Sequence, residues 1–201
     1  MLALGGKRFF PPSFLSNVED EDILMRKTTL FIAASLDGYI ARKDGGVDWL
    51  HGQDASADDM TGYDAFIRDI DTVVMGWNTY HQVTAELSRA EWPYRGLTAY
   101  VMTHRTPPPT KEDIQFVDRD VCALIAELKQ RPGKGIWICG GAGVIRPLLQ
   151  GGEIDRLHIS VIPILLGDGI PLFGGPGREL PLRLLRTESY NGITDLVYDV
   201  E

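Results

Sequence analysis

The feature that most constrains this chain is a glycine-rich turn between two apolar segments, residues 136–149. Four consecutive apolar residues, 136–139, predict a short buried strand. Four small residues follow the strand: Gly140, Gly141, Ala142 and Gly143. The next apolar residues have the spacing of one helix face: Val144, Ile145, Leu148 and Leu149. The segment therefore predicts a strand that turns through glycines directly into a helix.

Such a turn is suited to bind a phosphate or pyrophosphate group. Backbone N–H groups at the start of a helix lack intrahelical acceptors, and the helix dipole adds partial positive charge there. Glycine allows the tight turn and leaves room for the ligand to approach the backbone. The spacing is neither that of the dinucleotide fingerprint G-x-G-x-x-G nor that of a P-loop. By itself, the segment is equally consistent with a plain strand–turn–helix connection.

Length and composition indicate an ordinary globular domain. The chain has 201 residues, of which 44% are hydrophobic and 24% charged, so it can bury a substantial core. The net charge of −8 argues against a general nucleic-acid-binding surface but allows an anionic cofactor held by a few local donors. No apolar run reaches the roughly 18 residues needed to span a bilayer. We expect neither a nucleic-acid nor a membrane partner.

The N-terminal residues 1–25 differ from the rest, because a double proline and an acidic run interrupt any periodicity. We interpret 1–25 as a poorly ordered extension and 26–201 as the folded domain. The two cysteines, Cys122 and Cys139, fall in a predicted helix and a predicted strand, which favours a reduced, cytoplasmic protein. The histidines are scattered, so we expect no metal site.

From residue 28 onward, strands alternate with helices. The expected strands are 29–34, 72–75, 97–102, 114–117, 136–139, 154–163, 182–190 and 193–200. The expected helices are one near 59–70, a short one with Asn78 or Thr79 as its N-cap, 121–130, and the helix after the glycine turn. Asn191 and Gly192 predict a tight hairpin between the last two strands. The pattern predicts an α/β fold whose central sheet of about eight strands is mostly parallel with an antiparallel C-terminal edge.

Four motifs in this order resemble a known family. They are 33–41 (AASLDGYIA), 74–80 (VMGWNTY), 140–143 (GGAG), and 167–169 (GDG) with Leu172 and Phe173. Over about residues 26–200 the chain resembles dihydrofolate reductase and, more closely, the reductase of riboflavin biosynthesis, the RibD C-terminal-domain family. This resemblance implies a three-layer dihydrofolate reductase-like fold that binds NADPH across the carboxyl ends of its strands.

The resemblance also implies which residues hold the cofactor. The backbone at Ala33, Ala34 and Ile40 would flank the nicotinamide. A second group would lie at the phosphates, from the start of the short helix and from the glycine turn: Gly76, Trp77, Asn78, Thr79, Gly140, Gly141, Ala142, Gly143 and Val144. A third group would lie by the adenosine 2′-phosphate: Thr103, His104 and Arg105.

Two positions depart from the family pattern. Dihydrofolate reductases usually carry an arginine for the 2′-phosphate where this chain has Trp77, so His104 and Arg105 would have to supply the positive charge. Riboflavin reductases typically have lysine where this chain has Tyr39, which replaces a cationic donor by a phenol with an ordinary pKa of about 10.

The candidate catalytic residues are Asp37, because it follows the first strand, and Tyr39, because the resemblance places it where the riboflavin reductases have their substrate-contacting lysine. Asp37 could instead stabilise the Asp–Gly bend as a turn residue. The candidate substrate residues are Trp49, Asp59 and Tyr63, which with Phe66 could form a pocket for a flat ring. Asp59 could equally be a charge at a helix N-terminus, and Phe66 could belong to the core.

The sequence thus predicts an NADPH-dependent reductase. It would transfer hydride to a small heterocyclic or ribosylaminopyrimidine-like substrate, in the manner of a 5-amino-6-(5-phosphoribosylamino)uracil reductase. The alternative is a nucleotide-binding protein of the same fold that has lost turnover. Because related reductases often dimerise, we also expect a homodimer.

Overall fold

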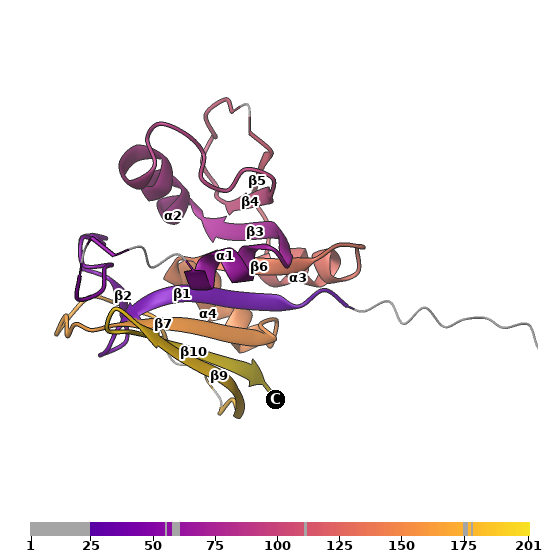
Figure 1. Ribbon diagram of the computed structural model, residues 1–201. Helices are drawn as coiled ribbons and strands as arrows, with labels where there is room; N and C mark the ends of the chain where they lie inside the picture. The colour runs from indigo at the N-terminus through magenta and orange to yellow at the C-terminus, as the bar shows by residue number, and fades with distance from the viewer. Residues whose placement is uncertain (1–24, 55, 58–60, 111, 175–176, 178) are drawn as a thin grey trace, which may run out of the picture.

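A computed structural model describes residues 25–54, 56–57, 61–110, 112–174, 177 and 179–201. Its centre is an eight-stranded sheet in the order β5-β4-β3-β6-β1-β7-β10-β9 (Figure 1). The strands of this sheet are β1 (Thr28–Ser35), β3 (Ile70–Gly76), β4 (Thr98–Met102), β5 (Ile114–Val117), β6 (Gly135–Gly140), β7 (Arg156–Ile162), β9 (Leu182–Tyr190) and β10 (Ile193–Val200). The strands from β5 to β7 are parallel, and β10 and β9 close the sheet as antiparallel neighbours. The predicted fold class is confirmed.

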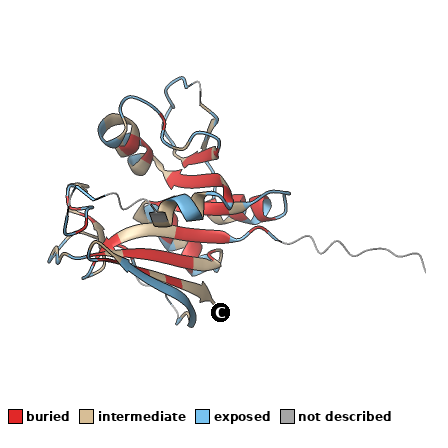
Figure 2. Cartoon of the chain, in the orientation of Figure 1, coloured by how far each residue is buried: buried red, intermediate tan, exposed pale blue. Residues whose placement is uncertain are grey.

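The helices complete a three-layer arrangement. They are α1 (Thr61–Ile67), α2 (Trp77–Gln82), the π-helix η1 (Val83–Leu87), α3 (Val121–Lys129) and α4 (Ala142–Gly151). Buried residues of α3 and α4 pack with Leu30 in one core cluster, whereas residues of α1, α2 and η1 belong to a second cluster on the other face, which Phe31 also contacts. Neighbouring residues of β1 thus serve opposite cores, as the alternation of strand side chains requires. The central strands are accordingly buried, and the edge strand β9 is exposed (Figure 2).

The C-terminal hairpin forms as predicted. Asn191 and Gly192 have φ values of 45° and 76°, the left-handed conformation that a two-residue turn between twisted strands requires. Asparagine and glycine tolerate this conformation better than other residues, which explains the strong local signal.

Some boundaries differ from the prediction. The expected N-cap at Asn78 or Thr79 is wrong, because α2 starts at Trp77 with the extended residue Gly76 as its N-cap. The helix expected near 59–70 ends at Ile67, since β3 already begins at Ile70. A two-residue strand, β8 (Ile170–Pro171), was not predicted; it pairs with β2 (Tyr39–Ala41) in a small separate sheet.

Both cysteines are free thiols, on α3 and β6 respectively, and each packs at the border of a core cluster. None of the helices within the described ranges is long and apolar enough to cross a membrane. Among the described residues there is also no cluster of three or more histidine, cysteine or acidic side chains that could hold a metal ion.

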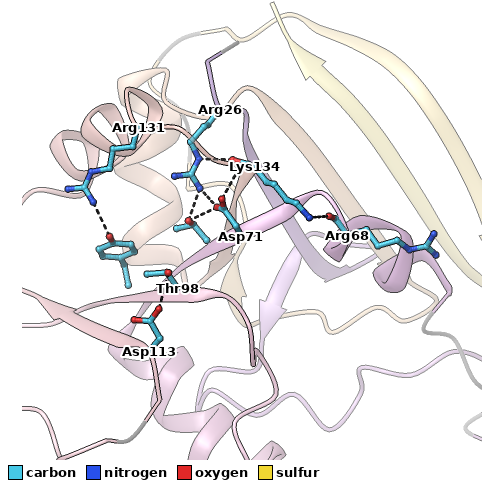
Figure 3. A network of polar contacts seen from close by, with 9 residues as sticks. Arg26, Arg68, Asp71, Thr98, Asp113, Arg131 and Lys134 are labelled. Atoms are coloured by element: carbon cyan, nitrogen blue, oxygen red, sulfur yellow. Dashed lines mark hydrogen bonds and ion pairs between the residues drawn. The ribbon is translucent and has the colours of Figure 1, made fainter. Parts of the chain in front are cut away.

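Arg26 joins three segments at the amino ends of the parallel strands (Figure 3). Its guanidinium forms an ion pair with Asp71 and donates hydrogen bonds to Thr72 Oγ1 and the Lys134 carbonyl, both at 2.6 Å. The Lys134 N–H donates in turn to Asp71 Oδ2 at 2.7 Å. Arg26 is only 7% exposed, so this network ties the start of β1 to β3 and to the turn before β6.

The expected domain boundary next to Arg26 remains a prediction, because residues 1–24 lie outside the described part. We expect deletion of residues 1–24 to leave the melting temperature nearly unchanged. Arg26→Ala should instead lower the free energy of unfolding by about 2–4 kcal/mol, somewhat less than for a fully buried pair because Asp71 is 37% exposed. Thermal and urea unfolding would measure both effects. A deletion as costly as Arg26→Ala would show that the boundary is misplaced.

Candidate functional site

The predicted cofactor segments meet at one edge of the sheet. In the sheet order, β4, β3, β6 and β1 are neighbours and run parallel, so their carboxyl ends lie side by side (Figure 1). Residues 33–34 end β1, residues 76–79 end β3 and begin α2, and residues 103–105 follow β4. The turn 140–144 joins β6 to α4. In open α/β sheets this edge is where ligands bind.

The glycine turn has the backbone geometry of an anion site. Gly140 ends β6 with φ +135°, which favours glycine, and the Gly140–Gly141 peptide bond is cis. Gly141 is the N-cap of α4, and its carbonyl accepts the N–H groups of Val144 and Ile145 at 2.9 and 3.1 Å. The earlier N–H groups of the helix have no carbonyl one turn back, so they remain available to a ligand.

The start of α2 lies against this turn. A Cβ placed on Gly141 would lie 3.3 Å from Thr79 Oγ1, and one on Gly76 would lie 3.5 Å from Val144 Cγ2. A Cβ on Gly143 would meet nothing within 4 Å. The Thr79 hydroxyl thus lies close to Gly141, and open space adjoins Gly143 in the first turn of α4. These residues fit a pyrophosphate group.

A cation lies at the other side of this edge, on a tryptophan. Arg105 Cζ is 5.4 Å from the centre of the Trp77 ring, within the range of a cation–π contact. The Arg105 N–H donates to Thr103 Oγ1 at 3.0 Å, and His104 pairs with the Asp118 carboxylate. The Arg105 guanidinium contacts no acidic side chain within the described ranges. Trp77 is not charged itself, but its ring holds the guanidinium of Arg105, so a positive charge is still present at this position.

Asp37 connects the end of β1 to the loop after β7. Its Oδ1 accepts the Ser35 hydroxyl at 2.6 Å and the Leu166 N–H at 3.1 Å, and its Oδ2 accepts the Gly167 N–H at 2.7 Å. These bonds, above all the one from Ser35, lower the pKa of Asp37, so the carboxylate is ionised near neutral pH. In this state it accepts hydrogen bonds and holds the loop.

Tyr39 packs in the small sheet beside that loop. A Cβ on Gly169 would lie 3.3 Å from the Tyr39 Cβ and Cδ1 atoms, so the tyrosine lies directly against Gly169. Lys43 forms an ion pair with Asp168, which raises the pKa of Lys43, and Tyr39 adds a smaller electrostatic contribution. The ion pair thus lies in the same loop as Gly169, the neighbour of Tyr39.

The structure does not bring the predicted substrate residues into one cluster. Tyr63 is half-buried on α1, and burial raises its pKa. Phe66 is half-buried and packs edge-on to Phe31 with ring centres 4.7 Å apart, against one of the core clusters, which favours the alternative of core packing. Trp49 is only 3% exposed and lies in a separate cluster with β7 and β10 residues. Asp59 lies outside the described residues.

Cys139 directly precedes the glycine turn. The Tyr94 hydroxyl lies 3.7 Å from its Sγ atom, and burial raises the pKa of Cys139 to about 11. The thiol is therefore neutral near pH 7, which argues against a role as nucleophile.

A buried polar group under α1 was missed by the sequence interpretation. His158 and Asp195 are 3% and 0% exposed, and His158 Nε2 lies 3.0 Å from Asp195 Oδ2. The Tyr190 hydroxyl donates to Asp195 Oδ1 at 3.2 Å, and a Cβ on Gly62 of α1 would lie 3.1 Å from Asp195 Oδ2. A sequence signal existed: Asp195 alternates with the buried Ile193 and Val197 and so points inward, where a carboxylate needs partners.

Hydrogen bonds determine the direction in which the pKa of the Asp195 carboxylate is shifted. Burial by itself raises the pKa of Asp195, but hydrogen bonds from His158, Ser160 and Tyr190 outweigh it, so the pKa is lowered overall. His158 also stacks on Phe31, with ring centres 4.0 Å apart. The network therefore joins β1, β7, β9 and β10 next to α1.

Comparison with known proteins identifies the family. The family model of the RibD C-terminal domain matches residues 26–198. Over 173 residues the chain is 39% identical to the Bacillus subtilis (strain 168) protein named uncharacterized protein YwjB, covering 86% of this chain and 97% of YwjB.

Solved structures agree with this result. A crystal structure from Shewanella sp. PV-4, whose name provisionally assigns it to riboflavin biosynthesis, superposes with a TM-score of 0.76 at 33% identity, covering 87% of this chain and 99% of that one. Dihydrofolate reductase from Enterococcus faecalis, complexed with NADP(H) and RAB-propyl, superposes with a TM-score of 0.61 at 16% identity, covering 87% and 96%. The second likeness concerns the fold alone. The chain therefore belongs to the RibD C-terminal domain family, whose reductases share the fold of dihydrofolate reductase.

Proposed function

We propose that this protein is an NADPH-dependent reductase that transfers hydride to a small heterocyclic or ribosylaminopyrimidine-like substrate. The observation that carries the proposal is the juxtaposition of the open glycine turn with Thr79 and, farther along the same edge, Arg105. Family membership adds the expectation of reductase chemistry. Titration of the protein with NADPH tests cofactor binding. NADPH oxidation with candidate pyrimidine acceptors then tests hydride transfer.

In this proposal the pyrophosphate lies on the turn 140–144 and next to the start of α2. The 2′-phosphate lies near Arg105, and the nicotinamide lies beside the backbone at Ala33, Ala34 and Ile40. A bound nicotinamide nucleotide supplies the hydride itself. The residues of the chain fix its position, while the β2–β8 sheet borders the space where the ring and the substrate would meet and limits access of water.

The substrate would lie between residues 37–39, Tyr63 and the loop 167–173, whereas Trp49 is buried in a separate cluster and does not line this space. Since Asp37 is ionised and accepts three hydrogen bonds, it serves mainly to hold this loop against β1. Tyr39, with its hydroxyl, is the candidate to contact the substrate.

One observation favours a second candidate function. Because tyrosine replaces lysine at position 39, the chain could bind a nucleotide without catalysing hydride transfer. NADPH binding with micromolar or better affinity, together with no oxidation in the presence of any tested pyrimidine acceptor, would favour this alternative.

We expect Arg105→Ala to weaken NADPH binding about 10-fold or more and to leave NADH binding nearly unchanged. A charge-assisted contact to a phosphate contributes about 1.5–3 kcal/mol, and NADH lacks the 2′-phosphate. Fluorescence titrations with both nucleotides measure the two dissociation constants. Equal losses for NADPH and NADH would mean that Arg105 does not contact the 2′-phosphate.

We expect Asp37→Asn and Tyr39→Phe to reduce turnover while NADPH affinity changes little. Asparagine presents an NH₂ group toward the N–H groups of the 166–167 loop, which misplaces the loop, and misplacement near 1 Å can cost about 100-fold in rate. Steady-state kinetics and NADPH titration separate the effects. A variant with a lower melting temperature but normal turnover would identify its residue as purely structural.

We further propose a homodimer that pairs the exposed strands β9. Leu182, Leu184 and Leu185 of this strand are 42%, 54% and 39% exposed. An edge strand with exposed apolar side chains is a template for pairing with a second chain, so these leucines favour a β9–β9 contact. Light scattering coupled to size-exclusion chromatography measures the mass directly. A monomeric mass at micromolar concentration would refute the dimer.

A further inference from the structure

Two tyrosines, Tyr63 and Tyr94, meet at Cys139 near the carboxyl end of β6. The Tyr94 hydroxyl lies 3.7 Å from Cys139 Sγ, and Tyr63 is close enough for Cys139 to act on it electrostatically. Both tyrosine rings pack edge-on against Trp137, with ring centres 5.8 Å away for Tyr63 and 5.1 Å away for Tyr94. Tyr63 belongs to α1, whereas Tyr94 belongs to the segment between η1 and β4. This tyrosine pair therefore brings two distant parts of the chain to one strand.

The tyrosine pair lies next to the glycine turn. Side chains alternate along a strand, so Trp137 and Cys139 face the same side of the sheet, the side of α1. Cys139 is followed directly by Gly140, the first residue of the turn. The two tyrosines and Cys139 are half-buried, so a ligand can reach them. A ring in contact with the pair would thus lie beside a nucleotide bound on the turn.

No positive charge acts on the tyrosine pair within the described ranges. Burial is the main cause that raises the pKa of both hydroxyls, and smaller contributions come from Cys139, from Asp64 and from the pair itself. A lysine or arginine close by would lower the pKa of a tyrosine instead. The pair therefore offers neutral hydroxyl groups, and a phosphate or carboxylate bound between them would stay without a counter-charge.

Two donors of this group lack an acceptor among the described residues. The Tyr63 hydroxyl has no hydrogen-bond partner there. Trp92 is 6% exposed, and its Nε1–H group also has no partner. The Trp92 ring packs edge-on to Tyr94, with ring centres 5.0 Å apart. A buried donor without an acceptor costs about 1–3 kcal/mol, which an oxygen or nitrogen atom of a ligand, or a water held beside it, would recover.

We propose that Tyr63 and Tyr94 bind an uncharged ring that carries hydrogen-bond acceptors, and that they select it against a ring with a negative charge. The aromatic side chains offer flat apolar contact, and the hydroxyls meet carbonyl oxygens or ring nitrogens. This inference rests on the proposed function, because it names the class of ring that would accept the hydride. It makes Tyr94 a specificity-determining residue whose hydroxyl Cys139 holds in place.

The test uses two pyrimidines that differ in charge. The probe 6-aminouracil is neutral near pH 7, whereas orotate has the same ring with a carboxylate at the same position. Calorimetric titrations are made with and without saturating NADP⁺, which permits no turnover. We expect the wild type to bind 6-aminouracil at least about 10-fold more tightly than orotate. Tyr63→Phe and Tyr94→Phe should each weaken 6-aminouracil about 2- to 10-fold, the effect of one lost hydrogen bond.

Tyr198→Phe is the matched control, because it removes a hydroxyl from β10 at the opposite edge of the sheet, where Tyr198 lies across from Leu157. It should leave both dissociation constants unchanged. Tyr63→Lys provides the reverse test, since it adds a cation on α1 and should shift the preference toward orotate by about 10-fold or more. A purely structural role of Tyr63 would not produce this change in preference.

Four results would overturn the inference. They are equal affinity of the wild type for both probes, binding of neither probe, unchanged 6-aminouracil affinity in both phenylalanine variants, and an equal loss in Tyr198→Phe. The proposed function can fail separately. A protein that binds 6-aminouracil through the tyrosine pair but does not bind NADPH would refute the cofactor assignment and keep the ring site. Normal NADPH binding without any effect of the tyrosine variants would refute the ring site alone.

Discussion

Gly141→Val is expected to abolish NADPH binding while the protein remains folded. The φ of Gly141 is −70°, which valine adopts without strain, and the first added carbon would lie 3.3 Å from Thr79 Oγ1. The branched methyl groups beyond that carbon would fill the space proposed for the pyrophosphate. We expect the dissociation constant to rise more than about 100-fold, which corresponds to roughly 3 kcal/mol.

Gly141→Ala gives the graded comparison for this prediction. Its single methyl group should weaken NADPH less than valine does, whereas circular dichroism and the melting temperature should stay close to those of the wild type for both variants. A folded Gly141→Val protein with wild-type affinity for NADPH would show that the glycine turn is not part of the binding site.

Asp195→Asn is expected to destabilise the fold by about 2–4 kcal/mol, because it leaves a fully buried network with mismatched partners. The effect should depend on pH in one direction. Since the folded pKa of Asp195 lies below the ordinary value of about 3.9, the carboxylate stabilises the fold at higher pH and loses this contribution as the pH falls through the folded pKa. The difference from wild type should therefore be constant above about pH 5 and shrink below about pH 4.

Urea unfolding at a series of pH values measures this dependence. Asp64→Asn, an exposed change on α1, provides the matched control and should have little effect at any pH. If Asp195→Asn cost no more than Asp64→Asn, or if its cost grew toward acid pH, the buried network would not contribute in the way described.

Most of the fold could be predicted because its signals are local. The central strands are apolar runs, and the final hairpin is marked by Asn191 and Gly192, whose conformation few other residues adopt. The errors also have local causes. Asn78 and Thr79 are good N-cap residues, but the helix already begins at Trp77, after the extended residue Gly76, which offers no side-chain cap. β8 has only two residues and leaves no recognisable pattern.

The candidate site could be predicted only in part. The cofactor segments come together because parallel strands align their carboxyl ends, so strand order alone brings them to one edge. Other side-chain contacts near the site join residues far apart in sequence. Asp37 bonds to the N–H groups of Leu166 and Gly167, and Arg146 packs on Gly174 across a loop. Such contacts depend on the tertiary path of the chain and have no periodic signature.

The central claim is that NADPH binds on the glycine turn, and amide resonances of the full chain test it most directly. In ¹⁵N-labelled protein, titration with NADPH should shift the backbone amides of Gly141, Ala142 and Gly143 in a saturable manner. NADH should shift the same three amides but leave the Arg105 amide nearly unchanged. Saturable binding that leaves these three amides unshifted, or no binding at millimolar NADPH, would contradict the account.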